Sequence, residues 1–222
     1  MKAVIFANGE MNQTPRLVEL ANQADLVVAA DGGAHNAFDL GVQPDIVIGD
    51  LDSLDSTLRE HLMSQGVQLL PFPCDKDETD LELAIDYVVK ENANVIHIIG
   101  GLGGRIDQTA ASLAILADPR LDGRDIKLVD GIDTVRLIRY KTVLEGSIGD
   151  RVSLLAVGGD AHGVSTRGLK WSLQEETLYF HQARGISNEL VSDQATIQVS
   201  QGMLLCIHSH MANLPFNTGG KS

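Results

Sequence analysis

The chain has 222 residues, of which 44% are hydrophobic and 21% are charged. This composition indicates a globular protein with one large or two smaller domains and excludes a disordered one. The formal net charge is −13, which argues against nucleic acid or a membrane surface as a partner, because both are anionic.

The sequence carries no sign of export or membrane insertion. The apolar run before Asn8 is too short for the core of a signal peptide, and no run approaches the ~18 apolar residues of a membrane span. The two cysteines, Cys74 and Cys206, are far apart in the sequence, so they indicate neither a disulfide framework nor a zinc site. We expect a cytoplasmic protein.

The first part of the chain alternates short apolar runs with helical patterns. Because such runs are typical of strands buried on both faces, the alternation predicts a doubly wound, mostly parallel α/β sheet with helices on both faces. The predicted strands are residues 3–7, 26–30, 46–49, 67–72, 94–100 and 126–129, and the predicted helices are residues 15–24, 34–41, 56–66, 79–92 and 107–117.

The pattern changes near residue 132, which predicts a domain boundary. Short apolar runs separated by glycine-rich turns predict a smaller all-β domain, a sandwich or a barrel. We therefore expect an α/β domain over residues 1–131 and a β-rich domain over residues 132–222. The strands predicted in the second domain are residues 134–140, 151–157, 163–168, 177–180, 195–200 and 203–209.

Acidic residues gather where predicted strands of the first domain end. Asp50 and Asp52 follow the third strand, and a two-residue step along an extended segment points both carboxylates to one side. Close carboxylates repel each other unless a cation neutralises them, and oxygen ligands suit Mg²⁺. Asp80 is a candidate third ligand, although an acid in the first turn of a helix is also favoured by the helix dipole alone.

Glycine-rich loops follow the same strand ends. Gly32 and Gly33 follow the second strand, and Gly100 to Gly104 follow the fifth. Such loops let backbone N–H groups approach phosphate oxygens, and Arg105 adds a guanidinium for a bidentate contact. Ligands of open parallel sheets bind at this edge, so a nucleotide with Mg²⁺ is expected there. A tight turn between strand and helix explains Gly32 and Gly33 equally well.

The ordered set of motifs resembles the thiamin pyrophosphokinase family, also called thiamin diphosphokinase. The matching stretches are "DGGAHN" (31–36), "GDLDS" (49–53), "DKDETDLELAI" (75–85), "GGLGGRIDQTAASL" (100–113), "TRGLKWSL" (166–173) and "GISNEL" (185–190). The resemblance implies a homodimer of an α/β nucleotide domain and a β-rich thiamin-binding domain. It also implies transfer of pyrophosphate from ATP to the hydroxyl of thiamin, with release of AMP.

The motifs also assign candidate site residues, each by its position in this sequence. The predicted metal ligands are Asp50, Asp52 and Asp80, with Mg²⁺ as the cofactor; the predicted catalytic residues are Asp107, Arg105 and Asp80. The predicted nucleotide-binding residues are Asp31, Gly32, Gly33, Thr79, Gly103, Gly104 and Arg105. The predicted thiamin-binding residues are Asp107, Gln108, Trp171, Ser187 and Asn188.

Several of these residues have structural alternatives. Asp107 is an alternative helix cap, and Gln108 stands where many family members carry histidine. Trp171 offers an aromatic face for a cationic thiazolium, whereas a lone tryptophan in a β-domain is often a core residue. Ser187 and Asn188 are also common turn residues.

Two other functions remain open at this point. One is a sensor that binds nucleotide or thiamin without turnover, and the other is a Mg²⁺-dependent pyrophosphokinase or nucleotide hydrolase with another acceptor. The full set of acids argues against a sensor, and Trp171 with Ser187 and Asn188 favours thiamin as the acceptor.

Overall fold

The computed structural model describes residues 1–75 and 77–211. Residues 212–222, the end of the predicted second domain, lie outside the described part of the chain. The structure divides into two compact units, Met1–Gly131 and Ile132–Ser222.

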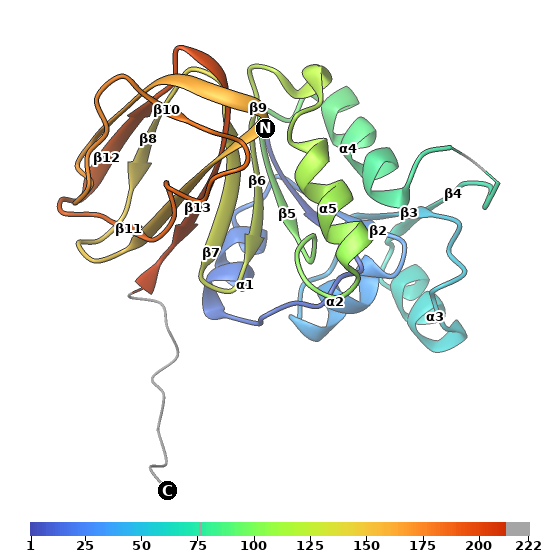
Figure 1. Cartoon of the computed structure of the whole chain (residues 1–222). Coiled ribbons are helices and arrows are strands. Elements are labelled where there is room, and N and C mark those ends of the chain that lie inside the picture. Colours follow the sequence, from blue (N-terminus) through green and yellow to red (C-terminus); the bar gives the residue numbers. More distant parts are fainter. Residues whose placement is uncertain (76, 212–222) are drawn as a thin grey trace, which may run out of the picture. The chain divides into compact units, whose positions relative to one another are not determined.

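The first unit is built on a parallel sheet with the strand order β4-β3-β2-β1-β5-β6 (Figure 1). Because β1 lies between β2 and β5, the strand order reverses there, and the gap between these strand ends is the switch point at which such sheets bind ligands. The strands are β1 (Lys2–Phe6), β2 (Leu26–Ala30), β3 (Ile46–Gly49), β4 (Gln68–Pro71), β5 (Val95–Ile99) and β6 (Asp125–Asp130).

Helices cover both faces of this sheet. The helices are α1 (Pro15–Asn22), α2 (Gly33–Asp39), α3 (Ser56–Ser64), α4 (Asp80–Lys90) and α5 (Ile106–Ile115), followed by a short 3-10 helix, η1 (Pro119–Leu121). Phe6 belongs to a core with α1, α2 and α3. Ile5, the preceding residue, is fully buried outside that core and points to the opposite face, where α4 contacts β1, β2 and β3. The predicted parallel sheet with two covered faces is confirmed.

His97 on β5 is a buried polar residue in this core. Its side chain is almost fully enclosed, and within the described part of the chain its Nδ1 has no hydrogen-bond partner. Burial disfavours the imidazolium and, with the nearby Lys127 cation, lowers the pKa of His97 to about 4 from 6.5.

This pKa predicts acid sensitivity. Between pH 6.5 and pH 4, His97 is protonated in the unfolded chain but stays neutral in the folded chain. The free energy of unfolding therefore falls as the pH falls through this range. The loss is on the order of 3 kcal/mol, since each pKa unit corresponds to about 1.4 kcal/mol. Denaturant unfolding of the wild type and His97→Leu at several pH values checks this: the difference in unfolding free energy between them should change by that amount over this range. His181→Leu replaces an exposed histidine, so the difference in unfolding free energy between this variant and the wild type should change little over the same pH range.

The second unit is an antiparallel sheet with the order β7-β13-β9-β12-β8, to which β10 and β11 are added beside β9. Its core lies between β9, β12 and β13 and is formed by residues such as Leu154, Ile197 and Leu204. The strands are β7 (Asp133–Ile138), β8 (Lys141–Glu145), β9 (Arg151–Arg167), β10 (Glu176–Leu178), β11 (Asn188–Glu189), β12 (Gln194–Gln198) and β13 (Gln201–Ser209). The predicted antiparallel β architecture is confirmed.

Two details of this unit differ from the sequence prediction. The segments 151–157 and 163–168 were expected to be separate strands, but β9 runs continuously from Arg151 to Arg167. Gly158 and Gly159 have positive φ values, so they allow β9 to continue through an irregular stretch instead of ending there. β8 was not predicted at all, because its sequence "KTVLE" is mostly polar.

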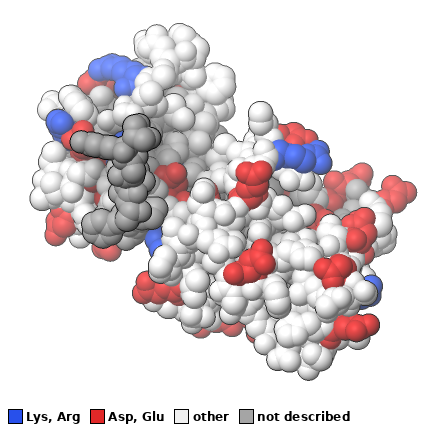
Figure 2. Space-filling view, turned by 90° about the horizontal axis from the view of Figure 1, so that it is seen from below, with Lys and Arg blue, Asp and Glu red and all other residues white. Residues whose placement is uncertain are grey.

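Within the described residues, no helix combines the length and the apolar character needed to span a bilayer. On the face of the molecule seen in Figure 2, acidic side chains are widespread, and lysine and arginine are few and scattered. That face therefore offers no basic patch for a polyanion.

Candidate active site

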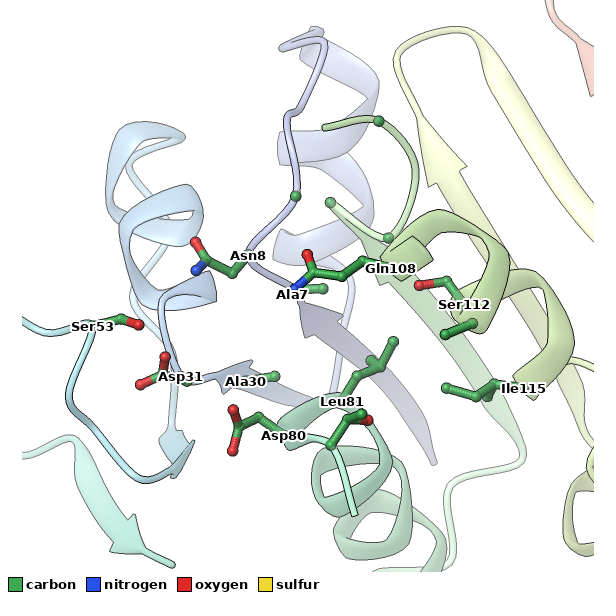
Figure 3. Close-up of a pocket in the computed structure, with 16 residues that line it drawn as sticks. Ala7, Asn8, Ala30, Asp31, Ser53, Asp80, Leu81, Gln108, Ser112 and Ile115 are labelled. Atoms are coloured by element: carbon green, nitrogen blue, oxygen red, sulfur yellow. The ribbon is translucent and has the colours of Figure 1, made fainter. Parts of the chain in front are cut away.

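A pocket of about 260 Å³ opens at the switch point of the first unit (Figure 3). Its walls come from the loops after β1, β2, β3 and β5 and from the starts of α4 and α5, so segments far apart in the sequence meet there. It is lined by residues that include Asn8, Asp31, Ser53, Thr79, Asp80, Gly101, Gly103, Gln108 and Ser112. This is the edge at which the sequence predicted a nucleotide.

Three carboxylates meet beside this pocket. Asp31, Asp50 and Asp80 each offer an oxygen, and these atoms all lie within 4.8 Å of one another. Asp31 is buried, and among the described residues its Oδ1 has no hydrogen-bond partner. Three anions at this spacing repel one another, and a buried, unsatisfied carboxylate oxygen is costly, so a cation bound by the group would stabilise it. An all-oxygen donor set of this kind fits Mg²⁺.

The start of α4 fixes one of these carboxylates. Thr79 caps the helix: its Oγ1 accepts from the backbone N–H of Glu82 at 3.3 Å, while the Glu82 carboxylate accepts from the N–H of Thr79 at 2.8 Å. This reciprocal capping box stiffens the first turn. Asp80, the first residue of α4, is thereby held with its carboxylate facing the pocket (Figure 3).

Asp52 is placed differently from the other predicted ligands. The premise of an extended step from Asp50 to Asp52 is wrong, because Leu51 between them has φ 63 and turns the chain. Asp52 is exposed and groups with Asp50 and Cys74. The Asp50 carboxylate, which repels the charged form of Asp52 and shares a hydrogen bond with it, raises the pKa of Asp52.

Asp31 takes the third place beside Asp50 and Asp80 instead. It has φ 43 directly after β2, and its N–H donates to the carbonyl of Ile48 on β3 at 2.8 Å. The sequence placed Asp31 among the nucleotide-binding residues. Because the order of strands in the sheet is not written in the sequence, its approach to Asp50 could not be predicted.

The two glycines before α2 have a packing role. A Cβ at Gly33 would lie 2.0 Å from the carbonyl oxygen of Phe6, and one at Gly32 would lie 2.4 Å from Nδ2 of Asn8. The need for glycine here comes from space and not from the tight turn considered as the alternative, since Gly32 has φ −57. Both glycines let the start of α2 lie close to the end of β1 and the loop after it.

Gly33→Ala is expected to destabilise the first unit, because the neighbour that the new methyl group meets is backbone and cannot rotate away. Overpacking of this kind costs about 1–3 kcal/mol. Chemical denaturation should show that loss. Gly41→Ala serves as a comparison, because a Cβ there meets nothing within 4 Å and its loss reports only the strain of a φ of 67. A Gly33→Ala protein as stable as the wild type would contradict the packing argument.

The loop after β5 carries the remaining predicted residues of this unit. Gly103 lines the pocket, and both Gly103 and Gly104 have positive φ values that favour glycine. Arg105 is the N-cap residue of α5 and makes no capping hydrogen bond through its side chain. Gln108, one turn into α5, faces the pocket (Figure 3).

Arg105 and Asp107 pair with each other at the start of α5, and neither is among the residues that line the pocket. The guanidinium donates to the Asp107 carboxylate through Nε at 3.1 Å and Nη2 at 2.6 Å, and both side chains are largely exposed. The hydrogen bond from Arg105 lowers the pKa of Asp107. Asp107 is not the N-cap of α5, because it is the second residue of that helix. Its Oδ1 accepts from the backbone N–H of Gln108, the following residue, at 2.9 Å.

In the second unit, the structure brings Trp171 and Asn188 together. The Asn188 side chain accepts from the Trp171 N–H at 3.1 Å and donates to the Trp171 carbonyl at 2.7 Å. Ser187, the residue before Asn188, has φ 58, and its N–H donates to Oγ of Ser153 at 3.0 Å. Trp171 is 55% exposed, so the alternative of a core tryptophan is wrong.

Comparison with known proteins agrees with this architecture. The thiamin pyrophosphokinase catalytic-domain model matches residues 17–128, and the vitamin B1 binding-domain model of the same enzymes matches residues 139–204. Thiamine pyrophosphokinase of Bacillus subtilis is 27% identical, with 94% of this chain and 99% of the relative covered. Thiamine pyrophosphokinase 2 of Oryza sativa subsp. japonica is 29% identical over 89% of this chain and 84% of the relative.

Solved structures give the same result. The Bacillus subtilis thiamine pyrophosphokinase crystal structure superposes with a TM-score of 0.84 at 25% identity, covering 94% of this chain and 99% of that one. Yeast thiamin pyrophosphokinase has the same fold, with a TM-score of 0.80 at 20% identity over 96% of this chain and 88% of that one. A parallel α/β unit followed by an antiparallel β unit is thus the architecture of these enzymes.

The chain belongs to the thiamin pyrophosphokinase family. The resemblance predicted from the ordered motifs is confirmed.

Proposed function

We propose that the protein transfers pyrophosphate from ATP to the hydroxyl of thiamin in a Mg²⁺-dependent reaction and releases AMP. The observation that carries the proposal is the group formed by Asp31, Asp50 and Asp80 beside the switch-point pocket. Family membership supports the pyrophosphate transfer, and the carboxylate group supports a metal–nucleotide complex at this edge.

Asp31, Asp50 and Asp80 would hold the metal. When bound, Mg²⁺ would neutralise charge on the phosphate oxygens and so make the phosphorus easier for a nucleophile to attack. Asp52, predicted as a ligand, remains a candidate for a second ion through its contact with Asp50.

The chain's own residues bind and orient the substrates. Gly103, Asp31 and Thr79 line the pocket assigned to the nucleotide, and Gly104 follows Gly103 in the same loop. Arg105 is available as a phosphate ligand because exposed ion pairs such as Arg105–Asp107 contribute little and exchange readily. A bidentate guanidinium suits the transferring phosphoryl groups.

In the transfer step, the thiamin hydroxyl oxygen forms a bond to the β-phosphorus while the bond from that phosphorus to the oxygen bridging to the α-phosphorus breaks, and AMP leaves with the bond electrons. The hydroxyl proton passes to Asp107 or to water. As a carboxylate, Asp107 would accept a hydrogen bond from the hydroxyl and so orient it. Such transfers depend mainly on positioning and charge neutralisation.

In the second unit, Trp171 would stack on thiamin, with Asn188 holding the backbone of Trp171 in place and Ser187 beside it. The exposed indole face suits a cationic thiazolium. A homodimer acting in the cytoplasm completes the proposal, and light scattering of the purified protein tests its dimeric state.

Incubation of the purified protein with ATP, Mg²⁺ and thiamin tests the proposed reaction. Thiamin diphosphate and AMP in equal amounts are expected. Binding without turnover would instead support a sensor, and nucleotide cleavage that does not depend on thiamin would support a hydrolase or another acceptor. Either of these results contradicts the proposal.

A further inference from the structure

The second unit contains a group of metal-ligating side chains that the proposed reaction does not use. Asp150 directly precedes β9, His208 lies near the end of β13, and His210 follows that strand. One nitrogen of each histidine and one oxygen of Asp150 all lie within 4.8 Å of one another. Residues two apart on an extended chain point to the same side, which is how His208 and His210 both reach Asp150.

The distances within this group match metal coordination. Nε2 of His208 lies 3.1 Å from Oδ2 of Asp150, and Nδ1 of His210 lies 3.7 Å from the same oxygen. A zinc ion bound at about 2.0–2.2 Å holds neighbouring ligand atoms roughly 3.0–3.6 Å apart. The two separations from Asp150 lie in or next to this range, and the histidine nitrogens lie within 4.8 Å of each other, so side-chain adjustment would let all three atoms bind one ion.

Neighbouring groups fix the orientation of these ligands. Oδ1 of Asp150 accepts from the N–H of Met211 at 2.8 Å, and Oδ2 accepts from the N–H of Ser147 at 2.9 Å. Oγ1 of Thr134 lies 3.4 Å from Nε2 of His210, the ring nitrogen opposite the one that faces Asp150. Outer contacts of this kind orient histidine and carboxylate ligands in known metal sites.

The group is largely enclosed, and His210 is its most exposed member. The side chains of His208 and Asp150 are 1% and 2% exposed, whereas that of His210 is 22% exposed. Gly146 lies directly against the group, since a Cβ there would lie 2.6 Å from Oδ2 of Asp150 and 2.9 Å from Nε2 of His208.

The hydrogen bond between Asp150 and His208 does not explain why His210 also lies beside the same carboxylate. The ring centroids of His208 and His210 are 4.0 Å apart, so both imidazoles stand beside one carboxylate. An imidazole nitrogen is the commonest metal ligand in proteins.

We propose that Asp150, His208 and His210 bind one divalent transition-metal ion, with zinc preferred and water in the remaining position. Two imidazoles with a single carboxylate suit zinc better than Mg²⁺, which prefers oxygen ligands. The ion would cross-link the end of β13 to the turn before β9 and so stabilise the second unit. This proposal is independent of the proposed reaction, because none of the three residues has a place in it.

Zinc titration of the full-length protein, first stripped with a chelator, tests the proposal. Calorimetry on the wild type should show zinc binding that His210→Ala loses and that Thr134→Val weakens roughly 10- to 100-fold, the usual effect of removing an outer contact. Zinc should raise the Tm of the wild type but not that of His210→Ala. His181→Ala, which removes an exposed histidine outside the group, is the matched control and should bind zinc like the wild type.

Two further measurements keep the test decisive. Cobalt bound to the wild type should give visible d–d bands that are absent from His210→Ala. Cys74 with Asp50 and Asp52 is a competing site, so Cys74→Ser should retain the zinc affinity of the wild type. The proposal is overturned if the wild type binds no zinc, if His210→Ala binds it equally well, or if only Cys74→Ser loses binding.

Discussion

Asp80→Asn is expected to lower kcat by roughly 1,000-fold, a loss of about 4 kcal/mol of transition-state stabilisation, while the protein remains folded. The amide keeps the shape of the side chain but removes one anion from the group formed with Asp31 and Asp50. A metal with one charged ligand fewer would be held more weakly and positioned less well beside the phosphates. Steady-state kinetics with ATP, Mg²⁺ and thiamin measure the effect.

The fold should tolerate this change. Asp80 sits in the first turn of α4, where an acid contributes about 0.3–1 kcal/mol through the helix dipole. Relief of the repulsion among the three carboxylates offsets part of that loss. Asp86→Asn is the matched control, since it removes the same charge from the same helix at a surface ion pair with Arg120. If both variants kept normal activity, Asp80 would have no role in the reaction.

Trp171→Ala is expected to raise KM for thiamin by up to roughly 30-fold, because stacking on a cation contributes up to about 2 kcal/mol. KM for ATP should stay nearly constant. Trp171→Phe should lie between the alanine variant and the wild type, since phenylalanine retains a smaller aromatic face.

The surroundings of Trp171 provide a second way to test this contact. Nζ of Lys170 lies 4.7 Å from the centre of the indole ring and is held by the Glu189 carboxylate at 2.8 Å. A cationic ligand on the same face would have to displace Lys170, so Lys170→Met is expected to lower KM for thiamin.

An unchanged KM for thiamin in Trp171→Ala would contradict a role of the indole in the thiamin site.

The sequence was sufficient to predict elements whose determinants are local. The continuous apolar run before Asn8 predicts a doubly buried strand, and Ala3 to Phe6 are fully buried on β1. Thr79 and Glu82 predict a capping box because the motif needs only residues three apart, and the structure contains it. The parallel sheet follows from the repetition of such elements.

Features that depend on the three-dimensional arrangement were not predictable in the same way. The left-handed conformation of Leu51 turns Asp52 away from the extended position that the spacing suggested. Asp31 reaches Asp50 because β2 pairs with β3, a fact that no local pattern contains. The group around Asp150 joins residues 58 positions apart, so its sequence signal is no more than two histidines at a two-residue spacing.

The most direct test of the metal–nucleotide site is a titration of the wild type and Asp50→Asn with Mn²⁺ in the presence of a non-hydrolysable ATP analogue, followed by electron paramagnetic resonance. Asp50 is chosen because it contacts both Asp31 and Asp80 and lies outside any helix. We expect tight, nucleotide-dependent Mn²⁺ binding in the wild type and binding at least roughly 10-fold weaker in the variant. Equal binding by both proteins would contradict the proposed site.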